Sequence, residues 1–299
     1  MRKGPTAGGR LFRLEVQCDA KLVAACGLLL TFLRAVLFVA ARRGIAPTSG
    51  FLDGAAVFLN GLRFDGRVAA LVTLPSFVCS LACLRFDVSR LARCVRAIAG
   101  GVFAGLAIAL GAVDLLYFRE FHAQFDRFVL GAIYDDLGAV LVTVWKTEPV
   151  IPALLVVATL AFLAVKLVLR CIAPLRPAEV EPTTRASPVT SFASVALVVA
   201  IFAVLLRGST WRRPAQAKDA AVTRDPLLNE LVVNPFFALH YAISDWRKLA
   251  GASGLYVHIP DGDVRAAARR VSDPDRSPQS VDDALARGER AGRSRGTCS

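Results

Sequence analysis

The sequence has little of what catalysis or metal binding requires. Its three histidines, His122, His240 and His258, are scattered, and none has a second ligand at helical or turn spacing. Its seven cysteines include no CxxC pair, and most of them fall in or beside apolar segments. This composition excludes a recognisable metal centre or disulfide framework. We therefore expect no catalytic residue, no metal ligand and no cofactor in this chain.

Charge is also scarce. Only 20% of the 299 residues are charged and 55% are hydrophobic, which gives a mean hydropathy of +0.51 and does not describe an ordinary soluble protein. The net charge of +12 comes from Lys and Arg residues that flank apolar stretches. That placement favours the membrane and its anionic phospholipid as partners, and it argues against nucleic acid.

Five apolar segments have the length of about 20 residues that a helix needs to cross a bilayer. They are residues 22–41, 67–86, 94–117, 150–170 and 188–207. The first segment lacks a small-residue cleavage site and ends in Arg42 and Arg43, so we expect it to remain as a signal anchor. The fold class predicted is an all-α membrane protein with five transmembrane helices.

The segments outside these spans differ in composition. Residues 1–21 are predicted to form a cytoplasmic N-terminus, and residues 50–65 and 121–145 have the spacing of helices that lie in the membrane interface. Residues 208–259 combine an Asp cap, an apolar helix face and an aromatic cluster, which is typical of a juxtamembrane helical connector. Residues 260–299 are highly charged and lack aromatic residues, so we expect a disordered linker.

Basic residues predict the orientation. They are most numerous before the first span, between the second and third, and between the fourth and fifth. Positively charged segments stay in the cytoplasm, so the N-terminus is expected inside and the C-terminus outside. The predicted location is a bacterial cytoplasmic (inner) membrane.

Two charges fall inside the predicted spans, Arg34 in the first and Asp114 near the outer end of the third. Each is costly if it faces lipid. Either Arg34 reaches back to the interface while Asp114 sits at the headgroups, or the two side chains contact each other.

Short motifs add a family resemblance. They are GLRFD at residues 61–65, Asp114 with Tyr117 and Phe118 at the end of the third span, and NPFFAL at residues 234–239. In order and spacing they resemble the lipoteichoic acid synthase and phosphoglycerol transferase family. These are sulfatase-like proteins of the alkaline-phosphatase superfamily, which join five membrane helices to an extracytoplasmic catalytic domain.

The resemblance implies that this chain anchors such an enzyme in the membrane and presents its lipid. The family's catalytic domain uses a threonine nucleophile and a divalent metal, usually manganese. Because the chain stops in the linker, we expect a truncated protein that is inactive alone, with a catalytic domain absent or separately encoded. Arg63 and Arg34 are the candidates for binding an anionic headgroup, since guanidinium pairs with phosphate, and Asp65 could hold Arg63 in place.

Two other functions remain open. A small multi-pass transporter would use Arg34, Asp114 and a kink at Pro75 as its substrate path. A membrane scaffold protein would use the connector and the charged tail to recruit a partner enzyme. Whether the chain belongs to an enzyme is therefore not decided by the sequence.

Overall fold

The computed structural model describes residues 5–126, 149–173, 188–209, 213 and 215–251, with isolated positions at 129, 138, 142, 145 and 146. Every element in these residues is a helix. The helices are α1 (Pro5–Ala41), α2 (Phe51–Ala82), α3 (Ser89–Phe121), α6 (Val150–Cys171), α7 (Pro188–Arg207), the 3-10 turn η2 (Ala217–Ala220), α8 (Pro226–Glu230) and α9 (Pro235–Gly251).

The predicted fold class is confirmed. Four helices, α1, α2, α3 and α6, are long and apolar enough to cross a membrane. The apolar helix α7, of 20 residues, is shorter. Large apolar side chains such as Leu155, Phe162 and Leu167 are exposed on α6, as expected for a helix that faces lipid. The chain is an all-α, multi-pass membrane protein.

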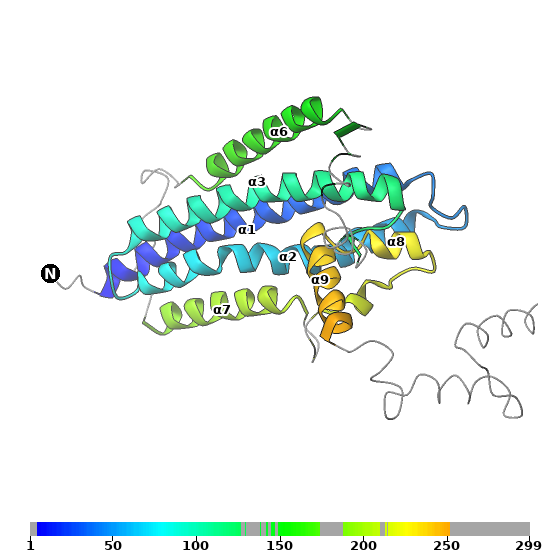
Figure 1. Cartoon of the computed structure of the whole chain (residues 1–299). Coiled ribbons are helices and arrows are strands. Elements are labelled where there is room, and N and C mark those ends of the chain that lie inside the picture. The colour runs from blue at the N-terminus through cyan, green and yellow to red at the C-terminus, as the bar shows by residue number, and fades with distance from the viewer. Residues whose placement is uncertain are drawn as a thin grey trace, which may run out of the picture. The chain divides into compact units, whose positions relative to one another are not determined.

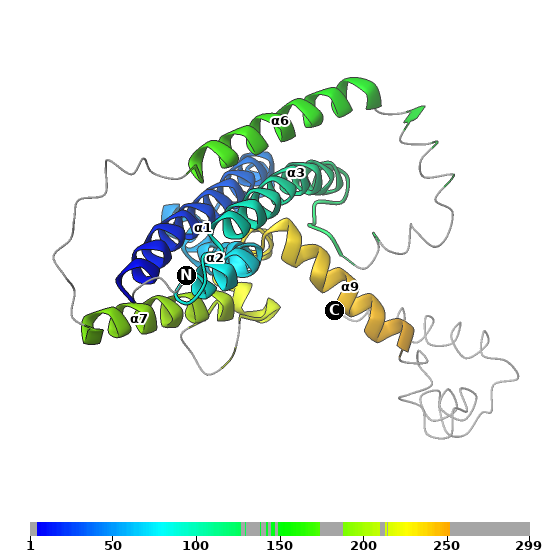
Figure 2. The same cartoon turned by 90° about the vertical axis from the view of Figure 1, so that its left-hand side faces the viewer.

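Helices α1, α2 and α3 pack against one another along their lengths, with α6 beside α3 and α7 beside α2 (Figures 1 and 2). The buried side chains between the first three helices include Leu22, Leu30 and Phe64. A Cβ at Gly100 of α3 would lie 2.8 Å from Leu22 Cδ1, so the absence of a side chain there lets the helices approach closely. Phe77 and Phe202 stack with centroids 4.0 Å apart and join α7 to α2.

Helices α1, α2 and α3 all begin earlier than the sequence predicted, and the difference is largest for α1 and α2. Residues 5–21 continue the first membrane helix, so α1 has 37 residues and a length of about 55 Å. Residues 51–65 do not form a separate interfacial helix, because they are the first half of α2. A single buried face runs without interruption through the boundary that the sequence predicted near residue 66. It includes Val57, Gly61, Phe64 and Val68.

The chain divides into two units, Met1–Ala242 and Ile243–Ser299. The first contains the membrane helices, η2, α8 and the start of α9. The described part of the second is residues 243–251, which complete α9. Most of the second predicted interfacial segment, residues 121–145, and the whole predicted linker, residues 260–299, lie outside the described residues.

Candidate functional site

A buried ion pair joins α1 to α2. Arg34 Nη1 donates to Asp65 Oδ2 at 2.5 Å, and Nη2 donates to Oδ1 at 2.8 Å. Arg34 is 2% exposed and Asp65 is 1% exposed. The two parallel bonds match the planar guanidinium to the carboxylate, the strongest geometry for such a pair. The pair neutralises two charges that would otherwise be costly within a membrane.

The same guanidinium holds the chain that leads into α9. Arg34 Nε donates to the carbonyl oxygen of Leu231 at 3.0 Å, and Nη2 donates to that of Val232 at 3.1 Å. A further bond of 3.3 Å reaches the Gly61 carbonyl. Gly61 must lack a side chain, because a Cβ there would collide with the guanidinium. Arg34 therefore links α1, α2 and the residues between α8 and α9.

Asn234 completes this network. Its Nδ2 donates to Asp65 Oδ1 at 3.1 Å, and its Oδ1 accepts from the backbone N–H of Phe237 at 3.0 Å. The second bond caps the start of α9, where Pro235 occupies the first helical position. We call Arg34, Asp65, Asn234 and Gly61 the connector clamp, because they fix the start of α9 to the membrane helices.

Aromatic side chains reinforce the clamp. Phe64 meets Phe237 edge to face with centroids 5.7 Å apart, and Phe103 stacks on Phe236 at 5.3 Å. The guanidinium of Arg67 lies 5.2 Å from the Phe237 ring centroid. Both phenylalanines of the NPFF motif therefore dock on α2 or α3, and such pairs contribute about 0.5–1.5 kcal/mol each beyond their burial.

The structure corrects the expected partners of the predicted charges. Arg34 neither extends to the interface nor pairs with Asp114, because Asp65 binds it inside the bundle. Asp65 does not hold Arg63, whose Nε donates instead to the Gly208 carbonyl at 3.3 Å. Sequence spacing could not reveal this, because Arg34 and Asp65 meet only when α1 and α2 pack together.

Asp114 lies apart from the clamp pair, on α3. It is 1% exposed, and its Oδ1 has no hydrogen-bond partner among the described residues. Its carboxyl group interacts with the backbone N–H of Phe125. The Tyr117 hydroxyl donates to Asp126 at 2.7 Å, and Phe118 is buried. The second motif of the resemblance thus lies at the end of α3, beside the turn that follows the helix.

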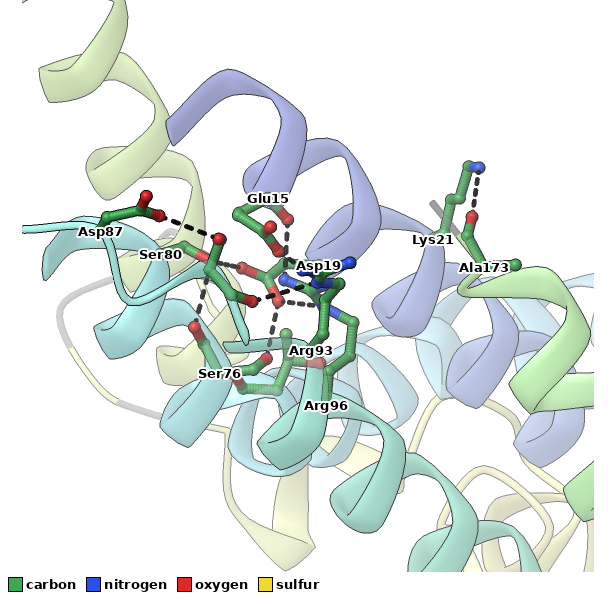
Figure 3. A network of polar contacts seen from close by, with 11 residues as sticks. Glu15, Asp19, Lys21, Ser76, Ser80, Asp87, Arg93, Arg96 and Ala173 are labelled. Atoms are coloured by element: carbon green, nitrogen blue, oxygen red, sulfur yellow. Dashed lines mark hydrogen bonds and ion pairs between the residues drawn. The ribbon is translucent and has the colours of Figure 1, made fainter. Parts of the chain in front are cut away.

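A second buried network was missed by sequence reasoning (Figure 3). Asp19 on α1 accepts hydrogen bonds from Ser76 at 2.6 Å, from Ser80 at 2.5 Å and from Arg96 Nε at 2.8 Å. Arg96 Nη1 also lies 2.9 Å from Glu15 Oε2, which is close enough for an ion pair. The angle between these groups is not that of a hydrogen bond, so Glu15 Oε2 has no hydrogen-bond partner among the described residues. Arg96 is 1% exposed.

A sequence signal for this network existed. Glu15 and Asp19 are spaced i, i+4, as are Ser76 and Ser80, so each pair shares one helix face. The signal was lost because residues 1–21 were expected to lie outside the membrane helices. Along α1, Asp19 and Arg34 are about 22 Å apart. The two polar networks thus enclose an apolar stretch somewhat shorter than a bilayer core of about 30 Å.

Asp225 holds the other end of the connector. Its carboxylate accepts from the backbone N–H of Leu227 at 2.9 Å, which caps α8, and from Ala46 N–H at 2.8 Å and the Ser49 hydroxyl at 3.0 Å. Burial acts to raise the pKa of this carboxyl, but the hydrogen bonds outweigh it and the net pKa is lowered. The loop between α1 and α2 is thereby joined to α8.

No family model, curated protein or solved structure matches the chain. Within the part of the chain that the structure describes, no three His, Cys, Asp or Glu residues are grouped so as to hold a metal ion. The hydrogen bonds among Arg34, Asp65 and Asn234 define the candidate site as the connector clamp.

Proposed function

We propose that this chain is the membrane-anchoring and lipid-presenting domain of a phosphoglycerol transferase of the sulfatase-like, lipoteichoic acid synthase type. The observation that carries the proposal is the connector clamp. Residues 61–65 and 234–239, which bear the resemblance, lie far apart in sequence, yet Asp65 and Asn234 share a hydrogen bond of 3.1 Å. Two independent motifs of one family are expected to meet if they serve one structural purpose.

The clamp suits an anchor. It fixes the start of α9 through the Leu231 and Val232 carbonyls, the Asp65–Asn234 hydrogen bond and a helix cap, so the chain enters α9 from a defined point. A catalytic domain, whether joined to this chain or separately encoded, would then be held near its lipid. We place the clamp at the outer face of a bacterial cytoplasmic membrane, with the N-terminus inside, as the basic residues predict.

Arg63 is the best candidate for an anionic headgroup. It is partly exposed, and only its Nε has a partner among the described residues, the Gly208 carbonyl. Arg67 lies one turn further along α2 and donates to the Ala215 carbonyl at 3.0 Å. Two guanidinium groups beside the end of α7 offer donors for a lipid phosphate. Arg34 is a clamp residue in this proposal, because its guanidinium is already bound inside the protein.

The test is lipid retention by the purified chain. The protein is reconstituted with equal amounts of phosphatidylglycerol and phosphatidylcholine, re-extracted in mild detergent, and its bound lipids are quantified by native mass spectrometry. We expect preferential retention of phosphatidylglycerol, and several-fold less of it in Arg63→Ala, since a charge-assisted bond is worth about 1.5–3 kcal/mol. Arg90→Ala, which removes an exposed arginine from α3, is the matched control. Equal retention of both lipids, or the same loss in both variants, would overturn the proposal.

The transporter remains the alternative from a different class, but the clamp weighs against it. A substrate path through Arg34 requires that its guanidinium be accessible, and here it makes five hydrogen bonds to protein groups. Flux of a phosphorylated solute into proteoliposomes that Arg34→Ala abolishes, while leaving the fold intact, would favour the transporter instead.

A further inference from the structure

A cavity of about 560 Å³ lies between α1, α3 and α6. Its walls are almost entirely apolar and include Leu29, Ile108 and Leu163. Along α1 it extends from Ala25 to Leu37, about 18 Å at a rise of about 1.5 Å per residue. One leaflet of a bilayer core is about 15 Å deep. The cavity therefore has the length and polarity of a groove for the acyl chain of a membrane lipid.

Polar groups are confined to the end of the cavity near the connector clamp. They belong to Arg34, Asp114 and Gln124. Arg34 directs its hydrogen bonds to Asp65 and to backbone carbonyls. Gln124 Nε2 donates to the Val233 carbonyl at 3.2 Å. Asp114 is the third polar residue at this end of the cavity.

Asp114 is the decisive group. Burying a carboxyl oxygen without a hydrogen-bond partner costs free energy. An oxygen of this kind in a folded protein therefore points to a ligand that donates a hydrogen bond to it. Asp114 Oδ1 is such an oxygen within the described part of the chain, and the residue lines the cavity. Glu230 lies close enough to interact electrostatically with it. A phosphate at this position would meet two acidic groups, so a negatively charged headgroup is disfavoured.

We propose that the groove between α1, α3 and α6 binds a neutral membrane lipid that carries a free hydroxyl group beside its acyl chains, the chemistry of a diacylglycerol. One acyl chain lies along α1, and the hydroxyl donates to Asp114 Oδ1. This site is separate from the anionic headgroup site at Arg63, on α2 beside α7. It depends on the membrane location of the chain and not on the proposed function.

The test uses photolabelling of the full chain in nanodiscs. The probe is a diacylglycerol with a diazirine and an alkyne on one acyl chain, and labelled peptides are mapped by mass spectrometry. We expect saturable labelling of α1, α3 and α6 that excess unlabelled diacylglycerol competes and phosphatidylglycerol does not. Asp114→Leu should weaken binding about tenfold, because it removes the hydrogen bond to the lipid hydroxyl.

A second pair of variants keeps the test decisive if Asp114→Leu does not fold. Ala112→Trp fills the groove from α3 without altering the carboxylate, and it should abolish labelling. Val113→Trp is its matched control, since Val113 is 54% exposed on the same helix and does not line the cavity. Arg63→Ala should leave labelling unchanged, which separates this site from the proposed function. Labelling that persists in Ala112→Trp, or competition by phosphatidylglycerol equal to that by diacylglycerol, would overturn the assignment.

Discussion

Removing the carboxylate of the connector clamp should strongly destabilise the protein. In Asp65→Ala the guanidinium of Arg34, which is 2% exposed, loses both bonds of the bidentate pair and retains only carbonyl acceptors. Leaving one member of a buried ion pair unpartnered costs about 3–5 kcal/mol. For a chain of this size the cost corresponds to a fall in Tm on the order of 10 °C.

The buried cysteines supply the assay. Cys18, Cys26 and Cys83 are buried in the folded protein, whereas Cys94 and Cys171 are exposed. Once the exposed thiols are blocked with an unlabelled reagent, further labelling by a thiol-reactive fluorophore reports the temperature at which the helices separate. Glu120→Ala, which removes an exposed carboxylate from α3, is the control and should leave Tm unchanged.

A double variant separates charge from packing. Replacing both Arg34 and Asp65 by leucine removes the unpaired charge, so it should recover much of the stability that Asp65→Ala loses, because paired and apolar cores are often similar in stability. An Asp65→Ala protein with the Tm of the wild type would refute the claim that the pair holds α1, α2 and the connector together. A double variant no more stable than Asp65→Ala would show that geometry, and not charge, sets the cost.

Three further variants test Gly61 of the clamp, the Arg96 network and the Asp225 cap. Gly61→Ala should lower the free energy of unfolding by about 1–3 kcal/mol, because its Cβ would collide with the guanidinium of Arg34. The control is Gly27→Ala, whose new Cβ has nothing within 4 Å. Measured by thermal unfolding, this control should be neutral or stabilising. Arg96→Met leaves two buried carboxylates unpaired and should cost about 3–5 kcal/mol, whereas Arg93→Met, at an exposed position, should not; equal losses would contradict the network. Because the pKa of Asp225 is lowered on folding, its stabilisation is present above its unfolded pKa of about 3.9 and is lost as the pH falls through the lower folded value. Asp225→Asn should therefore flatten the acid limb of a Tm against pH curve, and an identical limb would contradict this.

The sequence predicted the spans best where apolar composition alone defines them. The fourth and fifth predicted spans, residues 150–170 and 188–207, agree closely with α6 (Val150–Cys171) and α7 (Pro188–Arg207). These two helices lie on the outside of the bundle, and lipid requires apolar residues on most of their surface. The helices that contain the first two predicted spans extend beyond them, because α1 and α2 continue through polar residues that find partners on neighbouring helices.

The motif residues illustrate a different limit. The sequence singled out residues 61–65 and 234–239 by resemblance, and it singled out Arg34 as a charge in an apolar segment. The sequence did not show that Arg34 pairs with Asp65 or that Asp65 contacts Asn234. Arg34 and Asp65 are 31 residues apart, and Asp65 and Asn234 are 169 apart, so no local spacing connects them. Their pairing depends on which faces of α1 and α2 meet and on where the connector returns to the bundle.

The sequence by itself determined that this is a multi-pass helical membrane protein, because the length of an apolar helix and the thickness of a bilayer are both fixed by chemistry. Only the tertiary structure decided what its charged residues do. A buried charge must find a partner, and several partners were compatible with the sequence for Arg34, Asp65 and Asp114. Packing of the helices selected Asp65 for Arg34, left Asp114 at the end of an apolar groove, and joined Glu15 and Asp19 to Arg96.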